Sequence, residues 1–379
     1  MPSIQKKSPG IVRDAILSIL AESEKPMSVS EIERNVEIML GPTPSSSIRS
    51  YLRLNTPGLF TKDERGVYRQ PDSLESKTAS KPEKQIEWRE PYRFGKSILH
   101  HHNCIKWLAK RKKESVHAVV TDPPYGIHEY STEQISKLRS GKGGVWRIPP
   151  SFDGNTRAPL PRFTTLTSKQ LDELSTFFFD WGKYLLPALV PGANVIVASN
   201  PLLSHLVSNS LANAGLERRG ELVRLTMTMR GGDRPKNAHE EFNNVSVMPR
   251  SMWEPWLIFR KPLAGRVQDN LREWGTGGFR RISDQKPFGD VIISSPTRKQ
   301  ERQLAPHPSL KPQDFLRQIV RSVLPLGKGI ILDPFAGAGS TLAAAEAVGY
   351  ESVGVEQDDK YFSLASTAIP KLAILNVKK

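Results

Sequence analysis

Apolar positions near the start of the chain recur at the spacing of amphipathic helices. The stretch GIVRDAILSILAES keeps its apolar side chains on one helical face. A second such run, SVSEIERNVEIML, carries Ser28 three residues before Glu31, the spacing of a capping box. A third helix is predicted over residues 45–54, and LFTKDERGVYR predicts two short strands joined by a polar turn. Three helices and a hairpin predict a winged helix-turn-helix-like domain over residues 1–70.

Several side chains of this domain are candidates for contact with a nucleic-acid backbone: Ser45, Ser46, Ser47, Arg49, Arg53 and Arg65. The same unit could instead serve dimerisation or protein docking. Residues 71–90 are polar and lack an apolar period, so they predict a linker.

From about residue 91 the pattern changes to alternating strands and helices. Short apolar runs (HAVVT, ANVIVAS, PWLIFR, GIILD and ESVGVE) are separated by longer amphipathic segments such as LDELSTFFFDWGKYLL and QDFLRQIVRSVL. This order predicts an α/β fold over residues 91–379, with a mainly parallel sheet covered by helices on both faces. Within it, Trp253 and Trp256 are expected to be packing residues.

Composition narrows the class of protein. The chain has 379 residues, with 54 Lys and Arg against 39 Asp and Glu, and its formal net charge of +15 favours a polyanionic partner such as DNA. No apolar run approaches the roughly 20 residues of a spanning helix, and the N-terminus lacks the apolar segment of a secretory signal. We therefore expect no membrane association. The single cysteine, Cys104, excludes an internal disulfide and is consistent with a cytoplasmic location.

A glycine-rich segment, GIILDPFAGAGSTLAAAEAVGY, follows one predicted strand. The strand ends in Asp333, the turn carries Gly337 and Gly339, and a helix is expected to begin after Thr341. Glycines let the backbone approach a ligand closely, and a helix start offers unpaired amide donors. The next strand ends in Glu356, whose carboxylate could accept both hydroxyls of a ribose. The segment lacks the lysine of a Walker loop and the third glycine of a nicotinamide fingerprint.

A second motif, TDPPY, ends the strand HAVVT. Pro123 and Pro124 fix φ and lack N–H groups, so the turn can hold the Asp122 carboxylate stiffly, and Tyr125 adds a flat ring. Ligands of open α/β sheets bind outside the carboxyl ends of the strands, where both motifs fall.

The two motifs together carry a family resemblance. DPFAGAGST resembles the S-adenosylmethionine-binding motif of the DNA amino-methyltransferases, and TDPPY is similar to their catalytic motif. The catalytic motif precedes the cofactor motif, an order that resembles the permuted β class of adenine-N6 and cytosine-N4 methyltransferases. The resemblance covers about residues 92–372 and implies a Rossmann-like S-adenosylmethionine methyltransferase fold.

The same resemblance implies a set of cofactor contacts: Asp333, Pro334, Phe335, Gly337, Gly339, Ser340, Thr341, Glu356, Lys311, Ser309 and Asn103. The segment APHPSLKPQDFLRQIV, with His307 and Pro312, resembles the part of the family that closes over the methionine portion of the cofactor. Asn103 and Cys104 stand where the family usually has Gly-Asp near the adenine, so that contact departs from the pattern. No metal site is expected, because consecutive histidines 100–102 on a strand point to opposite faces and lack further Cys/His partners.

The resemblance also implies that the catalytic residues are Asp122, Pro123, Pro124 and Tyr125. An exocyclic amine is a poor nucleophile because its lone pair is delocalised into the base. Hydrogen bonds to Asp122 and to the carbonyl beside Pro123 would draw the nitrogen toward tetrahedral geometry, while Tyr125 stacks on a base flipped out of the duplex. In this family an aspartate at the first position is commoner among adenine-N6 enzymes, so N6 of adenine is the expected target and N4 of cytosine the alternative.

Basic stretches rich in Gly and Pro are expected to provide sequence specificity. Residues 131–163 predict a functional loop or lid in which Trp146 could fill the gap left by a flipped base or stack beside it. A target-recognition region is expected at about 227–300. The basic candidates for DNA contact are Lys142, Arg147, Arg157, Arg162, Arg230, Arg234, Lys236, Arg280 and Arg281. A solvated basic face is the alternative for each of them.

Two other functions remain open at this stage. An RNA or protein-glutamine N-methyltransferase would share the Pro-Pro-Tyr turn, but the basic excess and the motif order favour DNA. A non-catalytic DNA-binding regulator would share the fold, but the intact motifs favour an active enzyme. A cognate restriction endonuclease and a second copy of the chain are the candidate protein partners.

Overall fold

A computed structural model describes most of the chain. The described residues are 11–23, 25–54, 56, 60–63, 66–69, 88–124, 168–226, 232, 234–235, 238–307 and 309–377. The chain divides into two compact units, Met1–Glu87 and Trp88–Lys379.

The first unit contains three helices and an antiparallel hairpin. Its described elements are α1 (Ile11–Glu22), α2 (Val29–Leu40), α3 (Ser45–Leu54), β1 (Thr61–Lys62) and β2 (Tyr68–Arg69). The capping box is present, since Ser28 Oγ accepts a hydrogen bond from the Glu31 amide and the Glu31 carboxylate accepts one from the Ser28 amide. Ile16, Ile32 and Ile48, one from each helix, are buried in a common core. The elements follow the apolar pattern because each helix buries its apolar face against the other two.

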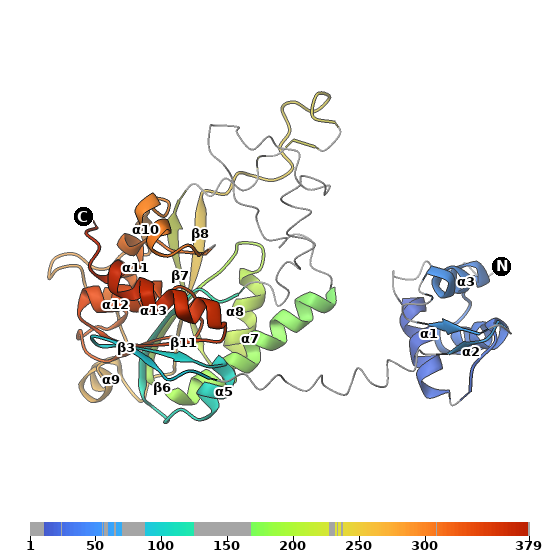
Figure 1. Cartoon of the computed structure of the whole chain (residues 1–379), viewed down its shortest axis with the longest axis horizontal. Coiled ribbons are helices and arrows are strands. Elements are labelled where there is room, and N and C mark those ends of the chain that lie inside the picture. The colour runs from blue at the N-terminus through green and yellow to red at the C-terminus, as the bar shows by residue number, and fades with distance from the viewer. Residues whose placement is uncertain are drawn as a thin grey trace. The chain divides into compact units, whose positions relative to one another are not determined.

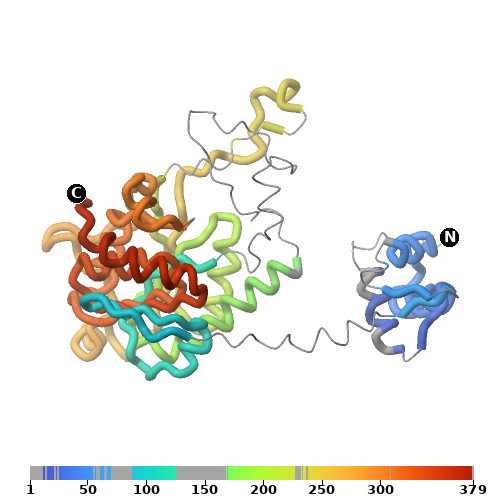
Figure 2. Tube along the Cα trace, viewed as in Figure 1, coloured from blue at the N-terminus to red at the C-terminus, as the bar shows by residue number. Residues whose placement is uncertain are grey.

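A mixed sheet of nine strands forms the centre of the described part of the second unit (Figure 1). In spatial order the strands are β3 (Tyr92–Phe94), β4 (Ser97–His101), β11 (Glu351–Glu356), β10 (Ile330–Asp333), β5 (Val116–Thr121), β6 (Leu189–Ala198), β8 (Trp253–Arg260), β7 (Glu217–Leu225) and β9 (Val291–Ile293). The strands from β4 to β6 are parallel, whereas β3 and β8 run antiparallel to their neighbours. Figure 2 shows how this order brings early segments, β3 and β4 in cyan, beside the red C-terminal part of the chain.

Helices cover both faces of the sheet. One layer contains α5 (Cys104–Ala109), α7 (Ser168–Ala188) and α8 (Ser204–Asn213), the other contains α11 (Gln313–Val323), α12 (Ser340–Val348) and α13 (Asp359–Ala373), and α9 (Val267–Trp274) and α10 (Lys299–Leu304) are shorter. Along β6, Val195 and Val197 pack with α7 and α8, whereas Ile196 packs with α11. Because both faces of the sheet are buried, the strands are continuous apolar runs in the sequence. The predicted α/β fold, a mainly parallel sheet with helices on both faces, is confirmed.

Some local expectations are wrong. The helix after the glycine-rich turn begins at Ser340 rather than after Thr341. Trp256 is buried in the core as expected, but Trp253 at the exposed start of β8 is 36% exposed. β7, ERRGELVRL, lacks the apolar pattern of the central strands. It lies next to the edge strand β9, which pairs with it only over residues 223–225.

The basic excess lies almost wholly in the second unit. Residues 1–87 hold 13 Lys and Arg and 12 Asp and Glu, which leaves 41 of the 54 and 27 of the 39 to residues 88–379, a formal +14 of the total +15. The electrostatic attraction to a polyanion therefore belongs mainly to the second unit. Within the described ranges, no helix combines the length and apolar character that crossing a lipid bilayer requires.

Candidate active site

The two motif-bearing turns meet at the carboxyl ends of neighbouring strands. β5 ends in Thr121 and β10, its parallel neighbour, ends in Asp333. The Thr121 hydroxyl donates to Asp333 Oδ1 over 2.7 Å, and both residues are buried. On the other side of β10, β11 ends in Glu356. One edge of the sheet therefore brings together three carboxylates from adjacent strands, those of Asp122, Asp333 and Glu356.

Asp333 ties its strand to the helix that follows. Its Oδ1 accepts a hydrogen bond from the Phe335 amide over 3.2 Å, and its carboxylate also accepts one from the Thr341 side chain. Burial raises the pKa of Asp333 to about 6, against the lowering effect of these hydrogen bonds. The carboxylate thus fixes both ends of the glycine-rich turn.

Two glycines of the turn have backbone conformations that disfavour side chains. Gly337 has φ of 51° and Gly339 has φ of 77°. A Cβ at Gly339 would lie 2.4 Å from Ile369 Cγ1 of α13, and one at Gly337 would lie 3.3 Å from the His307 ring. Gly339 therefore lets the turn pack on α13, and Gly337 keeps the surface beneath His307 free of a side chain.

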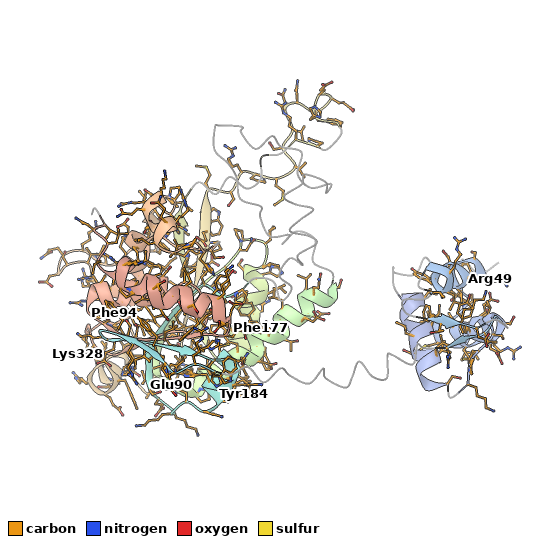
Figure 3. All side chains as sticks on the ribbon, viewed as in Figure 1. Arg49, Glu90, Phe94, Phe177, Tyr184 and Lys328 are labelled. Atoms are coloured by element: carbon orange, nitrogen blue, oxygen red, sulfur yellow. The ribbon has the colours of Figure 1, made fainter. Side chains whose placement is uncertain are left out.

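Other residues of the turn face the protein interior. The Phe335 ring packs against Trp181, at 5.4 Å between centroids, and against Phe177, which Figure 3 labels on α7. Pro334 is buried, and the Ser340 carbonyl accepts a hydrogen bond from Gln313 Nε2 over 2.9 Å. These contacts anchor the turn.

Glu356 faces the glycine-rich turn from β11. Its Oε2 accepts a hydrogen bond from the Gly337 amide and its Oε1 accepts one from the Asp358 amide, each over 2.8 Å. Burial raises the pKa of Glu356 to about 7, and the charge of Asp358 adds to the rise. Each carboxylate oxygen has a second lone pair, so the group can accept further hydrogen bonds.

The segment before α11 lies on the glycine-rich turn. The His307 ring packs edge-on against Tyr361, with centroids 4.5 Å apart, and its Nδ1 accepts a hydrogen bond from the Ser309 amide over 3.2 Å. Burial lowers the pKa of His307, although the nearby Asp122 charge acts in the opposite direction. The structure thus brings His307 to both the Asp122 turn and the Gly337 turn.

Lys311, from the same segment, lies between two carboxylates. Its Nζ is 2.9 Å from Asp122 Oδ2 and 2.7 Å from Glu254 Oε1. Glu254 Oε2 accepts a hydrogen bond from Arg224 Nη1 over 2.8 Å. The side chains of all four residues are only 8–15% exposed. Lys311, expected at the methionine portion of the cofactor, is therefore also a direct partner of the Asp122 carboxylate.

Asn103 borders the Glu356 side of the site. Its Oδ1 caps α5 by accepting a hydrogen bond from the Lys106 amide, and its Nδ2 donates to Gln357 Oε1, each over 3.1 Å. Burial raises the pKa of the neighbouring Cys104 thiol to about 12, which makes it a poor nucleophile. Among the residues that the structure describes, no three potential metal ligands form a group.

The predicted DNA contacts of the second unit are distributed unevenly. Tyr125 and the candidates Lys142, Trp146, Arg147, Arg157, Arg162, Arg230 and Lys236 lie outside the described residues, as does Arg65 of the first unit. Arg234 is exposed in the connection between β7 and β8, which leaves and re-enters the sheet at the edge that carries Asp122. Arg280 is not brought to this edge, because its Nη1 donates to the Tyr350 hydroxyl, 2.6 Å away, at the opposite end of β11. Arg281 lies at the same opposite edge, because β8 runs antiparallel to β6 and therefore ends there.

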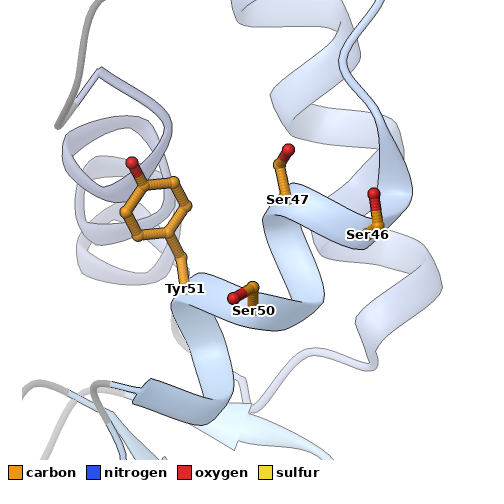
Figure 4. A pocket seen from close by; sticks show the side chains of 4 residues that line it. All are labelled: Ser46, Ser47, Ser50 and Tyr51. Atoms are coloured by element: carbon orange, nitrogen blue, oxygen red, sulfur yellow. The ribbon is translucent and has the colours of Figure 1, made fainter.

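In the first unit, the predicted contacts lie on α3. Arg49 is exposed (Figure 3) but pairs with Glu33 of α2, with 3.0 Å between Nε and Oε1, and the Ser45 hydroxyl donates to the same carboxylate. Arg53 is exposed on the same helix. A surface pocket on this helix is lined by Ser46, Ser47, Ser50 and Tyr51 (Figure 4).

Comparison with known proteins decides the family. Residues 116–367 match the model of the DNA methylase family of the N6/N4 type, well over half of the chain. The chain belongs to this DNA methylase family. The match runs from β5 into α13, includes both motif-bearing turns, and lies wholly within the second unit.

The methylase is similar to type II methyltransferases along most of their length. It is 24% identical to M2.DpnII of Streptococcus pneumoniae over 274 residues, which are 72% of this chain and 90% of the relative. M.HindIII of Haemophilus influenzae is 23% identical over 292 residues, 70% of this chain and 93% of the relative. Among solved structures, the DNA modification methylase TTHA0409 of Thermus thermophilus has a TM-score of 0.46 and 19% identity, covering 73% of this chain and 95% of its own. The cytosine-N4-specific PvuII DNA methyltransferase has a TM-score of 0.48 and 13% identity, and the match covers 76% of this chain and 90% of that protein.

Three residues of the methylase site are missing from the sequence prediction: Thr121, Glu254 and Arg224. Glu254 had a visible signal, since it is a charged residue at the start of an otherwise apolar run, EPWLIF. For Thr121 and Arg224 the sequence carries no such signal, because their partners Asp333 and Glu254 are distant in the sequence.

Proposed function

We propose that this methylase transfers a methyl group from S-adenosylmethionine to the N6 amino group of adenine in double-stranded DNA. The observation that carries the proposal is the meeting of the Asp122 turn with the Asp333 and Glu356 turn at the ends of adjacent strands. A donor held by one turn can face a base held by the other, and such positioning supplies much of the catalysis in group transfer.

The residues around the glycine-rich turn fit the cofactor. Gly337 leaves a surface without a side chain beneath His307, and Glu356 retains lone pairs for the two ribose hydroxyls. Asn103 and Gln357 border the same side, suited to the adenine. Bound S-adenosylmethionine supplies an electrophilic methyl group on a sulfonium.

Asp122 acts on the target amine. Its carboxylate accepts a hydrogen bond from the amine, which directs the nitrogen lone pair out of the ring plane toward the methyl donor. It is also placed to take the proton that the amine loses on transfer. Pro123 is buried and fixes the backbone beside it, and Tyr125 stacks on the base. These contacts require the base to leave the duplex, at a cost of a few kcal/mol.

The aspartate at the first position of the catalytic motif favours adenine, and cytosine N4 is the alternative target. The DNA lies at the carboxyl edge of the sheet, where Arg234 is exposed, and the basic side chains that the sequence predicts for residues 131–163 contact its phosphates. Arg49 and Arg53 of the first unit add contacts to the DNA backbone. The relatives are named as type II methyltransferases, which supports a role beside a restriction endonuclease in the cytoplasm.

The test is transfer of a tritiated methyl group to duplex DNA, followed by nucleoside analysis. We expect label in N6-methyladenine, no transfer by Asp122→Ala, and unchanged transfer by Asp172→Ala, an exposed carboxylate of α7. Label in N4-methylcytosine would replace the adenine assignment. Label only in RNA or protein, or full activity of Asp122→Ala, would overturn the proposal.

A further inference from the structure

A row of four alternating charges leads from the interior of the second unit to Asp122. In order it consists of Arg224 on β7, Glu254 on β8, Lys311 before α11 and Asp122 after β5. β8 and β5 are not neighbours in the sheet, since β6 lies between them. Lys311 therefore connects two strand ends that have no backbone contact with each other.

Arg224 is the fixed end of this four-charge row. Its Nε donates to Ser294 Oγ over 3.0 Å, its Nη2 donates to the Ser295 carbonyl over 3.2 Å, and its guanidinium lies 5.0 Å from the centroid of the Phe315 ring. A guanidinium engaged on several sides cannot reorient without breaking several contacts. It therefore holds Glu254 Oε2 in one place, 2.8 Å away.

Glu254 in turn holds the Lys311 ammonium, which lies 2.7 Å from its Oε1. Burial pushes the pKa of Glu254 up, but the cations of Lys311 and Arg224 outweigh burial and place it below its ordinary value. Burial pushes the pKa of Lys311 down, but the carboxylates of Asp122 and Glu254 outweigh it and raise that pKa. Lys311 is therefore a charged ammonium held between two acceptors.

We propose that Glu254 is a positioning residue for methyl transfer, acting through Lys311 to fix the orientation of the Asp122 carboxylate. The inference rests on the proposed function, because it assigns the four-charge row to the same reaction. Without the Glu254 charge, Lys311 would lose one of its two anchors, and its ammonium could move fully onto Asp122 and compete with the target amine for the carboxylate.

A purely structural ion pair would behave differently. Breaking a buried pair lowers stability, but it would reduce the transfer rate by the same factor at every pH. Among the described residues, the charged or titratable groups around Lys311 are Asp122 and Glu254 in contact, Arg224 behind Glu254, and His307 of its own segment. Removing the Glu254 charge removes a carboxylate that raises the pKa of Lys311, so the alkaline limb of the rate should move to lower pH.

The experiment measures single-turnover methyl transfer to duplex DNA by the full chain between pH 6 and 11, because the pKa of Lys311 in the wild type lies above its ordinary 10.5. For Glu254→Gln we expect a rate lower by roughly 10- to 100-fold, an alkaline limb at lower pH than that of the wild type, and nearly unchanged affinity for S-adenosylmethionine and DNA. Glu254→Asp keeps the charge but withdraws it by one methylene, so its rate should lie between those of Glu254→Gln and the wild type. If Glu254→Gln does not fold, the comparison of Glu254→Asp with the wild type decides.

The matched control is Glu217→Gln. Glu217 pairs with Arg260 over 2.6 Å on the same two strands, β7 and β8, but at the opposite edge of the sheet. This variant should lose stability without a change in transfer rate or pH profile. If the wild type is active, an unshifted pH profile in Glu254→Gln, or a wild-type rate in Glu254→Asp where only that variant folds, would overturn this inference alone. A wild type that binds the cofactor but transfers nothing to DNA would overturn the proposed function, and this inference with it.

Discussion

Thr121 donates its hydroxyl hydrogen to Asp333 over 2.7 Å, although the two residues are 212 positions apart in the chain. The bond joins the last residue of β5 to the last residue of β10, and both groups are buried. It couples the turn that carries Asp122 to the turn that carries the two glycines. A displacement of one turn must therefore strain the other, or break this bond.

Thr121→Val keeps the shape of the side chain and removes the donor. We expect the free energy of unfolding to fall by about 1–3 kcal/mol, because a buried carboxylate oxygen loses a partner. We also expect weaker binding of S-adenosylmethionine. Denaturant unfolding and equilibrium dialysis measure the two effects. Thr176→Val removes an exposed hydroxyl of α7 that donates to the Asp172 carbonyl, and it should change neither quantity. Similar losses in both variants would argue against a coupling role for Thr121.

Cofactor affinity should depend on pH through Glu356. Its pKa is raised to about 7, chiefly by burial. In the proposed function the ribose hydroxyls of the cofactor donate to the ionised form. As the pH falls below about 7, binding must first remove a proton, so the dissociation constant should rise by up to about tenfold per pH unit. Calorimetry between pH 5.5 and 7.5 measures the slope. Glu356→Gln should bind more weakly with a flatter profile, and equal slopes in both proteins would exclude Glu356 as the titrating group.

The fold was predictable because its signals are local. The strands around the site are apolar runs, and the turns at their ends carry Asp, Pro and Gly, so strand positions and the edge that binds ligands follow from the pattern. The pairing of β5 with β10 was not predicted, because periodicity does not specify which strands are neighbours.

The charge partners inside the site were not predictable in this way. Lys311 and Glu254 are adjacent only because the segment before α11 crosses the end of β6. The direction of β8 places Arg280 at the opposite edge of the sheet, and the basic composition of its segment does not encode that direction.

Gly339 should tolerate a methyl group less well than Gly349. Both have positive φ, 77° and 86°, at the two ends of α12, so alanine costs about 1–2 kcal/mol of backbone strain at either position. At Gly339 the Cβ would also lie 2.4 Å from Ile369 Cγ1, whereas nothing lies within 4 Å at Gly349. We expect Gly339→Ala to lose about 1–3 kcal/mol more stability than Gly349→Ala. Equal losses in chemical denaturation would mean that α13 can move aside.

Arg53 and Arg49 test whether the first unit touches DNA. Each phosphate contact contributes about 0.9 to the slope of log affinity against log salt concentration. Arg53→Ala should reduce the slope by about that amount, and Arg49→Ala by less, because Glu33 already pairs with Arg49. Arg272→Ala, in an exposed pair with Asp269 on α9, is the control. A slope for Arg53→Ala that matches the control would favour protein docking or dimerisation as the role of this unit.

The ionised Asp333 carboxylate should destabilise the fold above about pH 6. Its pKa is about 6 in the folded protein against an ordinary 3.8, because burial disfavours the charge. The folded state therefore binds the Asp333 proton more tightly than the unfolded state does. The stabilisation from this proton is complete below about pH 4 and is lost as the pH rises through 6, a total of about 3 kcal/mol in the free energy of unfolding. Asp333→Asn removes this titration. The stability of the variant relative to the wild type should increase by about that amount, 3 kcal/mol, between pH 4 and pH 8, while its cofactor affinity falls. Urea unfolding at a series of pH values measures the difference, and a difference that stays constant would show that Asp333 is already ionised in the folded protein at low pH.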